Sequence, residues 1–224
     1  PYINKLYKKN PHATSIYAES HPSLPNYIAM TSGSTQGITD DLPPASHRLG
    51  GPSLFGQMRK GWRSLEESMP SRCDLTSSGK YAVKHNPAAY YTKIRKRCRK
   101  RDVRLTNPPN ISARFTFVTP NLCNDMHSCA TSVGDTWLSN WLPKVLKTRK
   151  YRSGSTAIFL TWDEGSGSQP IATLVISPYT PPGTVSSVRL NHYSMLRTTE
   201  AMLGRKRFLG QAATARGMRR AFHL

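Results

Sequence analysis

The chain has 224 residues, of which 37% are hydrophobic, and its formal net charge is +20 at pH 7. This length suffices for one domain with a buried core. No apolar run approaches the length of a membrane span, which excludes a protein built from membrane-spanning helices. The excess of Lys and Arg favours polyanionic partners, namely nucleic acid, anionic lipid or phosphorylated substrates.

Strand-like and helix-like segments alternate along the chain. Apolar residues at helical spacing predict helices, and continuous apolar runs predict strands buried on both faces. The alternation indicates an α/β sheet with helices on both sides. In chain order we predict helices at residues 24–32, 53–62 and from 86 into the basic cluster 93–104, a strand at 114–119, a helix at 135–147, strands at 156–162 and 171–177, and a helix at 192–203.

We expect a single domain over residues 1–224, in which residues 205–224 form a basic C-terminal tail and the last dozen residues pack loosely. The sequence starts at Pro1, with neither an initiator Met nor a signal peptide. We therefore expect it to be cut from a longer precursor.

Ser23 directly precedes the first predicted helix, as an N-cap or pre-cap residue. Pro25 is tolerated in a first helical turn, and His21 and Asn26 belong to the same segment. A helix N-terminus offers N–H groups and partial positive charge to an anion such as phosphate. An ordinary capped helix is the alternative interpretation.

The four cysteines are an even number, which fits two disulfides in an oxidising compartment. Cys123 and Cys129 bracket five residues and could close a small loop, which leaves Cys73 and Cys98 as the other pair. A zinc site with His127 is an alternative, although the spacing is not that of a zinc finger. Four reduced, buried cysteines are another.

Polar residues follow three of the predicted strands or their loops, and functional sites of open α/β sheets gather at such strand ends. Asp163 and Glu164 are paired hard oxygen ligands suited to a divalent cation. A turn with a helix cap would also explain them, and a hydrogen-bonded structural His would explain each histidine. The other residues at strand ends are Asn121, Asp125, His127 and His192.

Six segments in this order resemble the bacterial phosphoesterase family: HPSLPNYIAMTSG, YAVKHNPAAYY, FTFVTPNLCNDMHSC, GDTWLSNWLPKVL, FLTWDEG and NHYSMLRTTE. The family holds secreted acid phosphatases, phosphatidylinositol-phosphate phosphatases and phospholipases C, within the alkaline phosphatase superfamily. The match covers about residues 1–204. It implies an α/β fold, an alkaline-phosphatase-like three-layer α/β/α sandwich, here lacking its first strand.

The resemblance assigns roles to single positions. Ser23 matches the nucleophile, which forms a phosphoseryl intermediate and is also a metal ligand, and Asp163 and Glu164 match the paired acidic metal ligands. His127 matches the residue that holds phosphate or protonates the leaving group, which would fit an acidic pH optimum. The substrate-binding set is His21, Asn26, His85, Asn86, Asn121, Asp125 and His192.

Two departures from the family pattern are visible. Relatives often have Asp before the histidine that opens the last helix, where this chain has Asn191. The family's first strand and a Glu-Asn pair that completes its metal site would lie upstream of Pro1.

The resemblance implies a metal-dependent acid phosphatase that is secreted by a bacterium and needs one or more divalent metal ions of unknown identity. Its partners would be a phosphorylated small molecule or a phosphoinositide or phospholipid head group, with an anionic membrane surface as a further candidate and no specific nucleic acid. A phospholipase C-type phosphodiesterase is the first alternative. A non-catalytic polyanion-binding protein is the second, because of the basic cluster at 93–104.

Overall fold

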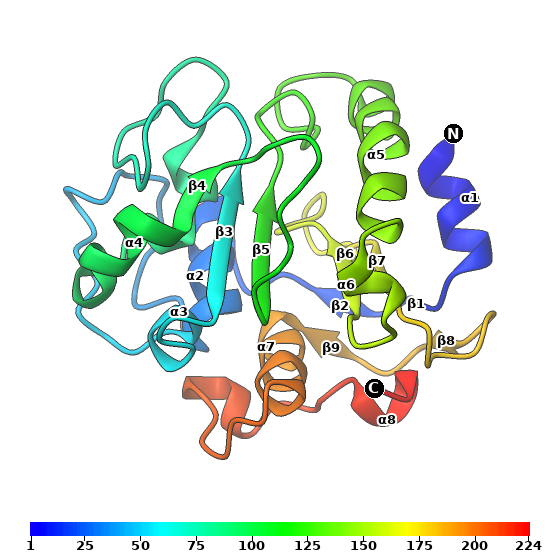
Figure 1. The fold of residues 1–224 in the computed structure, drawn as a ribbon. Coiled ribbons are helices and arrows are strands. Elements are labelled where there is room, and N and C mark those ends of the chain that lie inside the picture. Colours follow the sequence, from blue (N-terminus) through cyan, green and yellow to red (C-terminus); the bar gives the residue numbers. More distant parts are fainter. The chain divides into compact units, whose positions relative to one another are not determined.

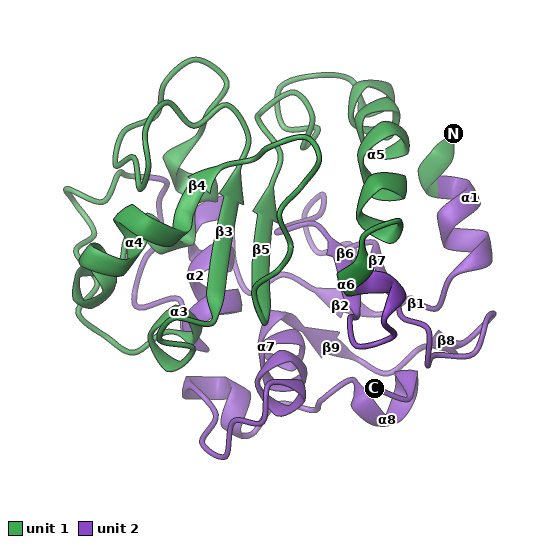
Figure 2. Cartoon of the chain, viewed as in Figure 1, with its two compact units in different colours: residues 1–3, 42–150 green, residues 4–41, 151–224 purple.

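The computed structural model describes all 224 residues, and the chain divides into two compact units (Figure 2). Unit 1 comprises residues 1–3 and 42–150, and unit 2 comprises residues 4–41 and 151–224. Both contain helices and strands (Figure 1), so the fold is mixed α/β, as predicted. None of the helices combines the length and the apolar composition that crossing a bilayer requires.

Unit 1 is built on a parallel sheet with the strand order β4-β3-β5. The Phe55 and Trp62 rings are fully buried and lie 4.7 Å apart, so aromatic packing anchors the start of the central strand. In chain order the elements are α3 (Leu54–Gln57), β3 (Trp62–Glu66), the 3₁₀ turns η1 (Val83–His85), η2 (Pro87–Ala89) and η3 (Thr92–Ile94), α4 (Arg95–Arg101), β4 (Asp102–Arg104), β5 (Phe115–Thr119) and α5 (Thr131–Leu146).

Unit 2 contains two small sheets. In the first, with the order β6-β7-β1-β8, only the β1–β8 pair is parallel, and in the second, β2 and β9 pair in parallel. The elements are β1 (His12–Ala13), β2 (Ile16–Tyr17), α2 (Ser23–Ser32), β6 (Ile158–Thr161), β7 (Thr173–Ile176), β8 (Val185–Ser186), β9 (Leu190–Asn191), α7 (His192–Met202), η4 (Gly210–Ala213) and α8 (Arg219–Phe222). Two helices cross the division of the chain, α1 (Tyr2–Lys9) and α6 (Arg149–Arg152).

The C-terminal segment of unit 2 is packed, contrary to the expectation of a loose end. Met218 and Phe222 are completely buried in a core shared with Ile16, Val175 and Leu190. Apolar side chains so close to the C-terminus hold the last helix against the sheet residues.

Gly33 ends α2 in the left-handed conformation, with φ of 74°. A Cβ at this position would lie 2.1 Å from the backbone oxygen of Leu209, and the carbonyl of Gly33 accepts a hydrogen bond from the amide of Gln211 at 2.7 Å. Glycine therefore permits the close approach of η4 to the end of α2.

Several predicted elements differ from the structure. The helix expected at 53–62 ends after one turn, since Arg59 has φ of 49° and Trp62 begins β3. The helix expected from residue 86 is replaced by 3₁₀ turns, and an α-helix begins only at Arg95. The strand predicted at 156–162 as buried on both faces is an edge strand, and its residues are half-buried.

The four cysteines form two disulfides, Cys73–Cys98 and Cys123–Cys129, and none is free. The second closes a small loop directly after β5, because its two cysteines are 6 positions apart in sequence. Paired sulfurs of this kind persist in oxidising surroundings, and they exclude the zinc–thiolate alternative.

Two buried carboxyl groups lie on one face of the sheet in unit 1. Asp102 pairs with Ser64 in the register of β3 and β4, and Glu66 is two residues along from Ser64, which places all three on the same face. The Ser64 hydroxyl donates to Glu66 at 2.7 Å, and the Asn86 side chain donates to Asp102 at 2.8 Å.

Burial raises the pKa of both acids, that of Asp102 to about 7 and that of Glu66 well above its usual range. The charge of Asp102 adds to the shift of Glu66, while hydroxyls of Ser64 and Thr119 oppose it. At Asp102 the Asn86 hydrogen bond and the Arg95 charge oppose the rise, and Asp74 adds to it. The folded chain therefore favours the neutral acids.

Because the pKa of Asp102 is raised on folding, its contribution to stability is complete below the ordinary carboxyl pKa and is lost as the pH rises through about 7. We expect Asp102→Asn to increase the free energy of unfolding by about 1–3 kcal/mol at about pH 8 and to change it little at about pH 4. Urea unfolding at both pH values measures this. Ser187→Ala, at an exposed position of unit 2, is the control. Equal effects of Asp102→Asn at the two pH values would contradict the expectation.

Candidate active site

Ser23 is the first residue of α2 and is almost completely buried. Pro22, in an extended conformation, occupies the N-cap position and makes no side-chain cap hydrogen bond, so the expectation that Ser23 caps the helix is wrong. The Ser23 hydroxyl instead donates to Glu164 Oε1 at 3.2 Å. A hydroxyl that is not used for capping and lies against a carboxylate is suited to act as a nucleophile.

An acidic side chain of the same unit accepts one of the free amide hydrogens at the N-terminus of α2. The Leu24 amide donates to Asp41 Oδ1 at 2.9 Å, and Pro25 has no amide hydrogen. The negative charge of Asp41 complements the positive end of the helix dipole. This end therefore has fewer amides to offer a phosphate than the sequence predicts.

The segment before α2 is held by the side chain of Asn26, which is completely buried. Its Oδ1 accepts hydrogen bonds from the amides of Glu19 at 2.9 Å and Ser20 at 3.1 Å. Its Nδ2 donates to the carbonyls of Ser20 at 2.7 Å and Pro22 at 3.3 Å. All of its polar groups are used within the chain, which makes Asn26 a structural support for this segment.

His21 projects from that segment to the loop after β6. Its Nδ1 contacts Glu164 Oε2, and its Nε2 lies 3.0 Å from the carbonyl of Gly167. The Gly167 carbonyl, followed by the Glu164 carboxylate, raises the pKa of His21. Glu164 is thus the common partner of His21 and Ser23.

His192 is completely buried at the first position of α7. Its Nε2 donates to the carbonyl of Asp163 at 2.6 Å, and burial lowers its pKa, so the ring is neutral with an acceptor at Nδ1. That Nδ1 atom has no hydrogen-bond partner in the chain, and neither does the buried Oδ2 of Asp163.

Glu19 is a further acid of this region that the sequence analysis missed. Its carboxylate accepts from the side chain of Asn191 at 3.3 Å and from the amide of Tyr193 at 3.4 Å. Burial raises the pKa of Glu19 to about 7, against the opposing effect of the backbone amides of Tyr193 and His192. Asn191 caps α7 through Oδ1 and donates to Glu19 through Nδ2, which an aspartate could not do.

The oxygen atoms of Asp163, Glu164 and Ser23 are the donor set that a hard divalent cation prefers. The buried Asp163 Oδ2 lacks a partner, which is costly for a carboxylate unless an ion or donor binds there, so these residues fit a cation. Cys73, Cys98 and Asp102 also lie close together, but both sulfurs are in a disulfide and cannot serve as thiolate ligands.

Unit 1 brings together a second set of expected residues. His85 Nδ1 lies 3.0 Å from Asp125 Oδ2, and Asp125 Oδ1 accepts from the amide of His127 at 2.8 Å. The rings of His85 and His127 meet edge to face, with centroids 5.3 Å apart. His127 is exposed whereas His85 is buried, so only His127 presents its ring to solvent.

Asn121 and Asn86 are both used inside unit 1. The Asn121 Oδ1 accepts from the amides of Cys123 and Asn124, both at 3.1 Å, and its Nδ2 donates to Ser68. Asn86 is completely buried and donates to Asp102. Both side chains hold backbone or buried groups in place.

Glu67, directly after β3, was also missed by the sequence analysis. Its carboxylate accepts a hydrogen bond from the backbone amide of Asn121 at 2.9 Å and one from Trp137 Nε1 at 3.0 Å. The Nδ2 of Asn124 donates to both carboxylate oxygens, at 2.9 and 3.0 Å. One carboxylate therefore joins the strand, the loop after β5 and α5. No local pattern in the sequence marks it, because its partners lie 54 to 70 positions away.

The model of the phosphoesterase family matches residues 12–204 of the chain, which include all of these side chains. The chain belongs to the phosphoesterase family. This confirms the family predicted from the six segments.

Named relatives of this phosphoesterase agree with the assignment. A phosphatidylinositol-3-phosphatase of Mycobacterium tuberculosis is 31% identical over 91% of this chain and 70% of its own length. A phosphate-repressible acid phosphatase of Penicillium chrysogenum is 28% identical over 90% of this chain and 54% of its own, and an acid phosphatase of Aspergillus fumigatus is 27% identical over 85% and 48%. The chain thus spans about half the length of these fungal relatives. The names support a hydrolase that acts on phosphate esters.

Removing the Asn26 amide leaves four part-buried backbone groups of the phosphoesterase without their partner. We expect Asn26→Ala to lower the free energy of unfolding by about 1–3 kcal/mol. Urea unfolding measures this, with Asn4→Ala, an exposed helical position, as the control. A variant as stable as the control would show that the Asn26 hydrogen bonds do not hold the segment.

Proposed function

We propose that the chain is a metal-dependent acid phosphatase that hydrolyses phosphate monoesters through Ser23. The observation that carries the proposal is the hydrogen bond from the buried Ser23 hydroxyl to Glu164 at the start of α2. Family membership and the names of the relatives support the reaction class. Phosphorylated small molecules or phosphoinositide head groups are the proposed substrates.

In the proposed mechanism the Ser23 oxygen attacks phosphorus in line, so that an O–P bond forms as the ester P–O bond breaks. Glu164 orients the hydroxyl through Oε1 and takes its proton as the O–P bond forms, and His21 holds Glu164 through the other oxygen. The product of this step is a phosphoseryl group, which water then hydrolyses. A divalent cation held by Asp163, Glu164 and Ser23 would lower the hydroxyl pKa and stabilise charge on the phosphoryl oxygens.

We propose that His127 protonates the leaving alcohol. Its exposed ring and the contacts of its loop with Asp125 support this role, since the Asp125 carboxylate accepts from the His127 amide and fixes the backbone. His85, Asp125, His21 and His192 stay as substrate-binding candidates. Asn26 and Asn121 are proposed as positioning residues, because both the oxygen and the nitrogen of each side chain are hydrogen-bonded within the unit. Asn86 is proposed as a third, because its Nδ2 donates to the buried Asp102.

Two further proposals concern the location of the protein and its fold. The two disulfides support a chain that works in an oxidising, extracellular location. The family assignment supports an alkaline-phosphatase-like α/β/α sandwich.

Ser23→Ala removes the attacking oxygen, so we expect kcat to fall by at least about 10³-fold. Release of inorganic phosphate from p-nitrophenyl phosphate measures it. Ser187→Ala, an exposed serine of unit 2, is the matched control and should keep the native rate. Unchanged turnover in Ser23→Ala would overturn the nucleophile assignment, and release of diacylglycerol from phospholipid vesicles would favour a phospholipase C-type diesterase.

Chelation tests the proposed cation. After treatment with a chelator, adding back a divalent ion at about a hundredfold excess over its Kd should stabilise the native chain by about 2.7 kcal/mol. Asp163→Asn should lose this gain, while Asp74→Asn should retain it. Thermal unfolding with and without each ion measures the effect, and equal stabilisation of the native chain and Asp163→Asn would argue against a site at Asp163.

A further inference from the structure

Glu19 connects the N-terminal ends of two helices of unit 2. It follows β2, whose Tyr17 pairs in parallel with Asn191 at the end of β9, so the chain leaves both strands at the same place. The Glu19 amide donates to Asn26 Oδ1 of α2 at 2.9 Å, while its carboxylate accepts hydrogen bonds at the start of α7. The backbone of Glu19 is therefore fixed on one helix and its side chain on the other.

The Glu19 carboxylate binds the residues on both sides of His192. Its Oε2 accepts from Asn191 Nδ2 at 3.3 Å, and its Oε1 accepts from the Tyr193 amide at 3.4 Å. Asn191 in turn caps α7, because its Oδ1 accepts from the Ser194 amide at 3.0 Å. A negative charge at this end of a helix also complements the helix dipole. His192 thus lies between two residues that are hydrogen-bonded to one carboxylate.

The ring of His192 connects this arrangement to the candidate cation site. His192 is completely buried, and its Nε2 donates to the carbonyl of Asp163 at 2.6 Å. The Oδ2 of Asp163 is buried without a partner, and Asp163 is followed directly by Glu164. A shift at the start of α7 would therefore move the backbone that carries two proposed cation ligands. The groups that hold metal ligands in place contribute strongly to metal affinity.

We propose that Glu19 is a positioning residue of the candidate active site, which sets the affinity for the divalent cation by holding His192 against the Asp163 carbonyl. Glu19 acts through these two residues and not by binding the ion itself. The inference rests on the proposed cation site of the phosphatase. It concerns how tightly the ion is held, and not which bond of the substrate breaks.

The amide of Asn191 is essential to this arrangement, because the side chain at position 191 both accepts from Ser194 and donates to Glu19. Asn191→Asp alone would keep the cap but set a second carboxylate against Glu19. Combining Glu19→Gln with Asn191→Asp exchanges the donor and the acceptor, so every hydrogen bond can form again. The combination also leaves the net charge unchanged. It therefore separates the hydrogen-bond arrangement from the identity of either residue.

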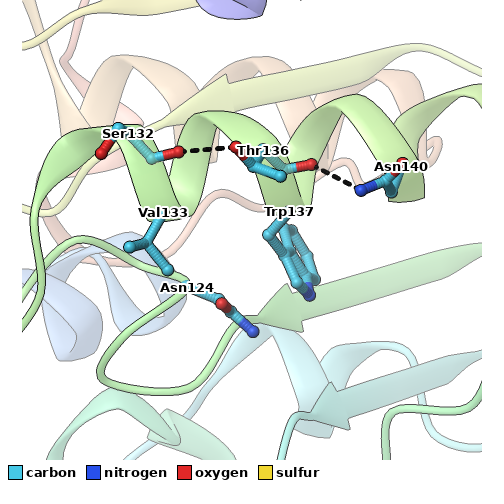
Figure 3. A pocket seen from close by; sticks show the side chains of 6 residues that line it. All are labelled: Asn124, Ser132, Val133, Thr136, Trp137 and Asn140. Atoms are coloured by element: carbon cyan, nitrogen blue, oxygen red, sulfur yellow. Dashed lines mark hydrogen bonds between the residues drawn. The ribbon is translucent and has the colours of Figure 1, made fainter.

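Unit 1 contains a comparable carboxylate that does not lead to a cation ligand. Glu67 binds Asn124 of the loop after β5 and Trp137, which projects from α5 toward Asn124 (Figure 3). Both partners line a pocket of about 450 Å³, and every side chain that lines it is uncharged. The partners of Glu19 instead flank a histidine that contacts Asp163. For this reason the inference concerns Glu19.

The test measures the cation affinity of the full chain after treatment with a chelator. Ca²⁺, Mg²⁺, Mn²⁺ and Zn²⁺ are titrated separately, by calorimetry, into the native protein, Glu19→Gln, Asn191→Asp and the double variant. Asp40→Asn is the matched control for the loss of one negative charge, because Asp40 is a half-buried acid of unit 2 outside its helices and strands.

Glu19→Gln and Asn191→Asp should each raise the Kd of the bound ion by about tenfold, as expected when a group that supports metal ligands is lost. The double variant should recover most of the affinity, because the hydrogen bonds around His192 are restored. The ion concentration that half-saturates hydrolysis of p-nitrophenyl phosphate should change in parallel. Asp40→Asn should match the native protein.

Thermal unfolding of the metal-free proteins distinguishes positioning from mere support of the fold. A Glu19→Gln variant with a lower Tm but an unchanged Kd would overturn the proposal, because Glu19 would then stabilise the chain without acting on the ion. A double variant that loses as much affinity as the two single variants together would also overturn it.

The same measurements separate this inference from the proposed function. The expected pattern of Kd values without hydrolysis of any ester would refute the phosphatase and support the role of Glu19. Hydrolysis that depends on an ion whose Kd is unchanged in Glu19→Gln would refute the role of Glu19 alone. Failure of the native chain to bind any of the ions would overturn the inference, whether or not esters are hydrolysed.

Discussion

The four hydrogen bonds of the Asn26 side chain are the constraint on which the Ser23 region depends. They hold the segment from Glu19 to Pro22 on the first turns of α2, and the position of His21 follows from that segment. Ser23 then begins the helix with its hydroxyl directed to Glu164. Without the Asn26 side chain, the backbone groups of this segment would form their hydrogen bonds with water instead. His21 and Ser23 would then lose their fixed positions.

Unit 1 uses the same principle with a carboxylate. Glu67 gathers donors from the loop after β5 and from α5, so a single side chain at the end of β3 fixes both. In each unit the segment that carries an exposed histidine is thus held by another side chain: Asn26 holds the segment of His21, and Glu67 holds the loop of His127. Such supporting residues determine how rigid a site is, because functional side chains gain precision from the groups that hold them.

The sequence predicts well where apolar spacing is regular. The helices α2, α5 and α7 and the strands β5 and β7 were expected within a few residues of their bounds. β3 was missed because two of its buried residues are Ser64 and Glu66, which break the apolar run, and β4 was hidden in a basic cluster whose only acid is Asp102. Strands of two residues carry no periodic signal at all.

The candidate site was found through the resemblance and not through local pattern. Ser23 and Glu164 are 141 positions apart, and nothing in either segment alone indicates the hydrogen bond between them. Glu19, Glu67 and the amide partners were missed for the same reason, since hydrogen bonding across long separations leaves no spacing rule. The N-cap assignment of Ser23 was wrong because Pro22 already supplies the extended residue before the helix.

Because Glu66 and Asp102 bind protons more tightly in the folded chain than in the unfolded chain, protons stabilise the fold through these two acids. A species that binds the folded chain more tightly than the unfolded chain shifts the equilibrium toward the folded one, and here that species is H⁺ itself. Through these two acids the population of unfolded chains exposed to proteases is smaller in mildly acidic surroundings than in neutral ones, whereas the lowered pKa of His192 acts in the opposite direction. Protonation of Glu66 and Asp102 thus contributes to how long the folded molecule persists.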